Sequence, residues 1–126
     1  MELGNKEHTK LKLATCFRII LKQKKSIGIK NKANNIEDIR LVDSMRQLEA
    51  ESGLSYTIIQ NTSAGKRDIQ FTTLLTMIEN LGLSFTEFAK LYDKITEKQI
   101  FDEKTEIDKS KKPKTKKRVK KSLPNP

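Results

Sequence analysis

A stretch near the middle of the chain constrains its fold more than any other part. Ser44 is followed three residues later by Gln47, which is the spacing of a capping box, where two backbone amides at a helix start are satisfied reciprocally. Gly53 can end that helix in the left-handed conformation that a sharp turn needs. Ser55 can then start a second helix after only two residues. The stretch therefore predicts two short helices joined by a tight turn.

Apolar residues at helical spacing extend this pattern in both directions. Gly82 can end the helix expected at 70–81. Ser84 with Glu87 forms a second capping-box pattern, which can start the helix expected at 84–95. Strand-like alternation is missing from long stretches, which favours an all-α fold. We expect a compact bundle of about five short helices, at 10–25, 44–52, 55–64, 70–81 and 84–95.

The excess positive charge lies mainly at the C-terminal end. The net charge is +10, and Lys109–Lys121 holds nine Lys or Arg and no acidic residue. Like charge, low hydrophobicity and Pro113 predict a disordered basic tail here. Such a tail can contact nucleic acid, or it can simply be a solvated, solubilising segment. The expected organisation is an N-terminal tail 1–9, one helical domain 10–97 with an inserted loop 27–43, and a Lys-rich, disordered tail 98–126.

Few residues could support catalysis or metal binding. Cys16 is the only cysteine and lies beside Phe17 on an apolar stripe, where a thiol serves as core filler. It cannot form an intramolecular disulfide, which favours a reducing, cytoplasmic setting. His8 is the only histidine, so a zinc site or general base has little support. Apolar runs are too short to cross a bilayer. We expect no enzyme activity, cofactor, metal, membrane or small-molecule substrate.

Several short motifs recur together at characteristic intervals. Gly53-Leu54-Ser55 follows Leu48, Gly65-Lys66-Arg67 follows Ile59, and Leu81-Gly82-Leu83-Ser84 closes an apolar helix before Phe88. In this combination the chain resembles the Cro/phage-repressor-like helix-turn-helix family, also called xenobiotic-response-element-type regulators. The resemblance covers about residues 44–92 and implies a lambda-repressor-like fold. Glu49, Thr62 and the long loop 27–43 depart from the family pattern.

The resemblance implies that the second helix of the motif faces the base edges of DNA. Helical spacing places positions 56, 57, 60 and 61 on a single face of that helix. Gln60 and Asn61 can each bond an adenine edge in bidentate fashion, and Thr57 or Tyr56 can contact a thymine methyl. Their alternative role is that of a solvated polar surface. The candidate DNA-binding residues are Gln47, Ser55, Tyr56, Thr57, Gln60, Asn61, Lys66 and Arg67.

These features predict a sequence-specific, DNA-binding transcriptional regulator of bacterial type, cytoplasmic and associated with the nucleoid. Its expected partner is double-stranded DNA. The alternative is an antitoxin-like or adaptor module that binds a protein and attracts nucleic acid only through its basic tail. The apolar residues Phe88, Leu91, Tyr92 and Ile95 have two candidate uses, as core or as a homodimer surface.

Overall fold

The computed structural model describes the backbone of residues 5–122 and the side chains of residues 5–109. This part of the chain is all-helical, as expected, and contains no strand. It has one helix more than the expected five. The helices are α1 (Asn5–Ala33), α2 (Met45–Ser52), α3 (Tyr56–Ser63), α4 (Phe71–Asn80), α5 (Phe85–Lys94) and α6 (Glu97–Ser122).

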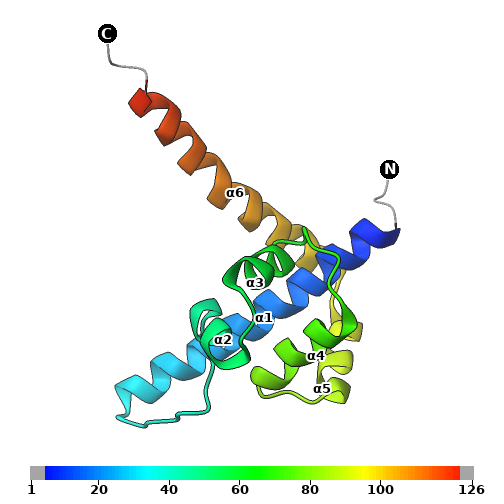
Figure 1. Cartoon of the computed structure of the whole chain (residues 1–126), viewed down its shortest axis with the longest axis vertical. Helices are drawn as coiled ribbons and strands as arrows, with labels where there is room; N and C mark the ends of the chain where they lie inside the picture. The colour runs from blue at the N-terminus through cyan, green and yellow to red at the C-terminus, as the bar shows by residue number, and fades with distance from the viewer. Residues whose placement is uncertain (1–4, 123–126) are drawn as a thin grey trace.

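The long helix α1 runs through the middle of the molecule, and α3, α5 and α6 pack against it (Figure 1). Helix α2 packs on α3 and α4, and α4 packs on α5. The apolar faces of α1 to α5 meet in one core, which explains why short helices that are marginal alone are stable together. Its buried members are Cys16, Phe17, Ile20, Val42, Leu48, Ile59, Met77, Ile78, Leu81 and Phe88.

The predicted bounds of the first helix were too short at both ends. Residues 5–9, expected to be a tail, and residues 27–33, expected to be loop, both belong to α1. Gly28 lies within α1, where a Cβ would collide with the side-chain carboxylate of Asp43 in its present position. The irregular segment therefore begins only at residue 34, where Asn35 adopts a left-handed conformation with φ 55°.

Helices α2 to α5 confirm the predicted bounds to within one residue at each end. Gly53 and Gly82 follow α2 and α4 with φ of 78° and 84°, as the turns require. The capping box at the start of α5 is complete: the Glu87 amide donates to Ser84 Oγ at 3.1 Å, and the Ser84 amide donates to Glu87 Oε1 at 2.8 Å. Phe88 is buried against Phe17, which gives this face of α5 a role in the core.

The prediction of a disordered tail from residue 98 was wrong for its first part. Helix α6 begins at Glu97, and Ile100, Glu103 and Ile107 are buried. These residues are isolated in sequence but fall on one face at helical spacing. The helix continues past Pro113 to Ser122, although a proline interrupts the hydrogen bonding of a helix interior. The expectation for residues 1–4 and 123–126 lies outside the described residues.

Candidate nucleic-acid interface

Helices α2 and α3 form a unit whose start and turn are fixed by local hydrogen bonds. Ser44 Oγ accepts from the amide of Gln47 at 3.1 Å and caps α2. The Gly53 amide donates to the carbonyl of Glu49 in α2 at 3.0 Å. Ser55 Oγ accepts from the amide of Ile58 at 3.2 Å and caps α3. The candidate residue Ser55 is thus exposed, but its hydroxyl is already used as a cap.

Gln47 differs from the expectation in its partner. Its side-chain oxygen accepts from the Asp43 amide at 3.1 Å, and not from the amide of Ser44. The predicted reciprocal capping box of α2 is therefore wrong in one of its two bonds. Because Asp43 precedes the cap by one residue, the Gln47 side chain fastens the incoming loop to α2. Gln47 lies in a hollow with Gly28, away from the other candidates.

The outer face of α3 carries three of the predicted side chains. Ile59 is fully buried and faces the core, whereas Thr57 and Gln60 are exposed and Asn61 is half-buried. Successive positions of a helix are rotated by about 100°, so Thr57 and Asn61 lie opposite Ile59 and Gln60 lies on the flank beside them. This face presents one hydroxyl and two amide groups, which can donate and accept hydrogen bonds on base edges.

Tyr56 lies at the edge of this face and is held by a residue that the sequence analysis did not single out. The guanidinium of Arg46 stacks over the Tyr56 ring at 3.9 Å from its centroid. Arg46 also forms an ion pair with Glu49 at 3.5 Å. The sequence offered one sign that Arg46 could contribute to this surface, namely its position in the first turn of α2, two residues after the Ser44 cap. Lys22 and Lys25 of α1 line the hollow beside this stack.

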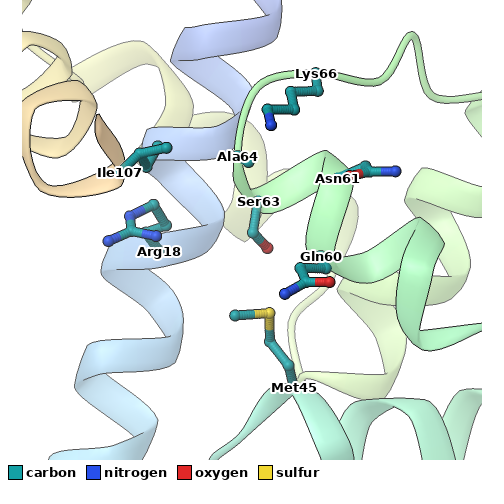
Figure 2. A pocket seen from close by; sticks show the side chains of 8 residues that line it. All are labelled: Arg18, Met45, Gln60, Asn61, Ser63, Ala64, Lys66 and Ile107. Atoms are coloured by element: carbon teal, nitrogen blue, oxygen red, sulfur yellow. The ribbon is translucent and has the colours of Figure 1, made fainter. Parts of the chain in front are cut away.

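Gln60, Asn61 and Lys66 share another hollow, of about 350 Å³, at the other end of α3 (Figure 2). Arg18 from α1 and Ile107 from α6 also line it. The face of α3 is therefore bounded on this side by two other helices. The residues that line the hollow are Arg18, Met45, Gln60, Asn61, Ser63, Ala64, Lys66 and Ile107.

The loop after α3 places Lys66 and Arg67, both exposed, next to the end of that helix. Gly65 has φ of 72°, and a Cβ there would lie 2.8 Å from Leu11 Cδ2. The amide of Lys66 donates to the carbonyl of Asn61 at 2.9 Å. Close packing on α1 and this backbone bond therefore fix where the two cations leave the loop.

Two basic residues of α1 near this interface are paired with carboxylates of α6. Glu103 accepts from Arg18 Nε at 2.6 Å and from Lys22 Nζ at 2.7 Å. Glu106 lies 3.2 Å from Arg18 Nη2 and 3.1 Å from Lys22 Nζ. The hydrogen bond to Glu103 raises the pKa of Lys22, and the hydrogen bond from Lys22 lowers the pKa of Glu106. We call these four residues the α1–α6 clamp.

Other chemistries find little support in the described side chains. Burial raises the pKa of the Cys16 thiol to about 12, which keeps it protonated and unreactive at neutral pH. His8 Nε2 lies 2.9 Å from Glu97 Oε2 at the surface. Within residues 5–109, no three or more His, Cys, Asp or Glu side chains are grouped as metal ligands would be. No helix in the same part of the chain has the length and apolar character needed to span a bilayer.

Comparisons of the chain with family models, curated proteins and solved structures found no match. A function for this chain must therefore be argued from its own residues. Those that the fold brings together are the exposed face of α3, the cations after it and the basic residues of α1 and α2 beside it.

Proposed function

We propose that this chain is a sequence-specific, DNA-binding transcriptional regulator in which α2 and α3 form a helix-turn-helix. The observation that carries the proposal is the capped, exposed face of α3, presented by the Gly53 turn. An α-helix with its side chains is about 10–12 Å across, so the exposed face of α3 (Tyr56–Ser63) can enter a major groove about 12 Å wide. The Cro/repressor-like family, a bacterial source and nucleoid association belong to the same proposal.

In this proposal the residues divide between reading the sequence and positioning the protein. Gln60 and Asn61 bond base edges, and Thr57 contacts a thymine methyl. Lys66 and Arg67 bind phosphates at the end of α3 and fix the register of the protein on the duplex. Arg46 adds a phosphate contact near the start of α3 through the guanidinium edges that the stacked ring leaves accessible. The mechanism requires binding alone and no catalytic step.

The test begins with selection of bound duplexes from a random pool at near-physiological salt. The double variant Gln60→Ala with Asn61→Ala should then lose discrimination between the selected and a scrambled duplex, by about 1–3 kcal/mol for each lost bidentate contact. Its affinity for scrambled DNA and its salt dependence should change little, because no phosphate contact is removed.

The matched control is Gln23→Ala with Gln70→Ala. Both residues are exposed amides away from α3: Gln23 lies in α1, and Gln70 precedes α4 and makes no capping bond with its side chain. This control should retain full discrimination. If the double variant in α3 discriminates as well as the parent protein, α3 is not the reader and the proposal is wrong.

One surface favours the rival function, a module that binds a protein partner. Phe71 and Phe85 are largely exposed and make an edge-to-face contact with centroids 5.8 Å apart. They border an apolar hollow with Leu13, Leu74 and Ala89. Exposed aromatic residues of this kind mark interaction surfaces. Replacing Phe71 and Phe85 with Ser should leave duplex discrimination unchanged if DNA is the principal partner.

A further inference from the structure

Helix α6 changes character along its length. From Glu97 to Asp108 it carries five acidic residues, and from Lys109 onward the sequence is strongly basic. The acidic part packs on α1 through the clamp, and the basic part continues the same helix away from the body (Figure 1). We propose that the α1–α6 clamp aims this basic segment as a rigid arm along the phosphate backbone of DNA beside α3. The partner assigned to the arm rests on the proposed function.

The clamp is well placed to fix a direction. The side chain of Glu103 is only 10% exposed and bridges Arg18 and Lys22, two residues one turn apart on α1. Ile100 and Ile107 are buried on either side of it along α6. A charged group buried between two apolar contacts has one arrangement in which its partners satisfy it, and sliding or rotating α6 would leave it unpaired.

The arm starts next to the candidate interface. Ile107 lines the hollow that also contains Gln60, Asn61 and Lys66 of the α3 end. The basic run begins two residues later, at Lys109. Thirteen helical residues from there to Lys121 span about 20 Å, or roughly six base pairs of duplex length. Phosphates that flank the site of α3 are therefore the nearest anions for the arm.

The pairing also explains why acidic residues sit so near a DNA-binding surface. Glu103 and Glu106 would repel phosphates if they were unpaired. In the clamp each of them faces both Arg18 and Lys22, so the local charge is balanced. The clamp thus holds α6 in place at little electrostatic cost to the binding of an anionic partner.

The first experiment tests the clamp in the protein without DNA. Spin labels are attached at Glu79→Cys on α4 and Lys120→Cys on α6, and their distance distribution is measured by double electron–electron resonance. The native Cys16 is buried and should not be labelled. The distribution should be narrow with the clamp intact and at least twice as wide after Glu103→Gln with Glu106→Gln.

The matched control is Asp102→Asn with Asp108→Asn. Among the residues whose side chains are described, these exposed carboxylates pair within α6, with Lys98 and Lys104. The control changes the net charge by the same amount and should keep the narrow distribution. Circular dichroism checks folding, and Glu106→Gln alone provides a milder variant if the double one unfolds. A distribution as narrow as the parent's in folded clamp variants would overturn the proposal.

The second experiment uses the selected duplex. Charge alone predicts that removing two carboxylates strengthens binding equally in the clamp variant and the control. A preorganised arm predicts that the clamp variant binds about 3–10-fold more weakly than the control, because its arm must be ordered on binding. Hydroxyl-radical footprinting should show protection of flanking phosphates at fixed positions in the control and diffuse protection in the clamp variant.

A reversed clamp separates positioning from mere charge. Arg18→Glu and Lys22→Glu with Glu103→Arg and Glu106→Lys keeps the net charge and restores all four ion pairs with their signs exchanged. It should recover the narrow label distance and the defined flanking footprint. Identical footprints and affinities in clamp and control variants would refute the arm. If no duplex binds the parent protein, the proposed function and the role of the arm on DNA both fail, whereas the label distances still report on the clamp.

Discussion

Ser63 has a polar group in an unfavourable place. Its Oγ is buried near the end of α3 and has no hydrogen-bond partner among the residues whose side chains are described. In Figure 2 this hydroxyl points in the direction of the Gln60 and Met45 side chains. A buried hydroxyl without a partner costs about 1–3 kcal/mol of desolvation.

We therefore expect Ser63→Ala to stabilise the protein by about 1 kcal/mol, since it removes the unpaired hydroxyl and improves helix propensity. Urea denaturation of the parent and the variant measures this. The neighbouring Thr62 is equally buried, but its hydroxyl donates to the Ile58 carbonyl at 2.8 Å. Thr62→Val is the control and should give no such gain. A loss of stability in Ser63→Ala would show that the hydroxyl is satisfied.

At the scale of elements, the two glycines that flank α3 differ in surroundings. Gly53 and Gly65 both have positive φ, of 78° and 72°. A Cβ on Gly53 would meet nothing within 4 Å, whereas one on Gly65 would press on Leu11. Gly53→Ala should cost about 1–2 kcal/mol from backbone strain alone. Gly65→Ala should cost more, because the contact with Leu11 adds to the same strain.

The free energy of unfolding of both variants, from urea titration, tests this order. Gly53→Asn should recover part of the loss, because asparagine adopts the left-handed conformation more readily than alanine does. If Gly65→Ala proves no more harmful than Gly53→Ala, Leu11 moves aside easily and the loop of Lys66 and Arg67 is less firmly fixed than the geometry indicates.

The sequence predicted α2 to α5 well because their signals are local. Ser44, Ser55 and Ser84 cap from within four residues, and Gly53 and Gly82 act through their own φ. The ends of α1 and the existence of α6 depend on partners far along the chain. Gly28 lies next to Asp43, fifteen residues away, and Glu103 accepts a hydrogen bond from Arg18, 85 residues away. Propensity and periodicity alone do not contain such partners.

The candidate site, like the fold, was predictable from the sequence where local spacing decides it and not where distant partners do. Periodicity placed Thr57, Gln60 and Asn61 on one face of α3, and the structure agrees. Arg46 stacks on Tyr56, and Ile107 of α6 lines the same hollow as Gln60. Both arrangements depend on tertiary packing, so no local sequence pattern predicts them. The sequence did contain one signal for the clamp: two cations one turn apart and two carboxylates three residues apart, at spacings that place each pair on one helix face. These residues are Arg18 and Lys22 on α1, and Glu103 and Glu106 on α6.

For the whole molecule, the clamp implies a stability that depends on pH in a defined way. The pKa of Glu106 is lowered from its ordinary value of 4.5, so its contribution is present above that pH and is lost as pH falls through the lowered value. The pKa of Lys22 is raised above 10.5, so its contribution is present below that pH and is lost as pH rises through the raised value. Between these limits the contribution of the clamp should be constant.

Melting temperatures measured from about pH 3 to 8 test this prediction. The parent should melt above Glu106→Gln near neutral pH, and the difference should shrink below about pH 4.5 as the carboxylate of the parent is protonated. Thr105→Ser, an exposed change beside the clamp, serves as a control and should follow the parent. A difference that persists unchanged in acid would mean that Glu106 contributes through packing and not through charge.

The sequence distance across the clamp also affects how the molecule is made. A ribosome adds Glu103 long after Arg18, and α1 emerges before any of the helices that cover it. Contacts at such separation carry a loop-closure cost that earlier contacts must first reduce. Among the described helices, α1 therefore gains its partners in the clamp from α6 after α2 to α5 have been made. A nascent chain that stops at α5 would display α3 without Ile107 of α6 at the edge of its hollow.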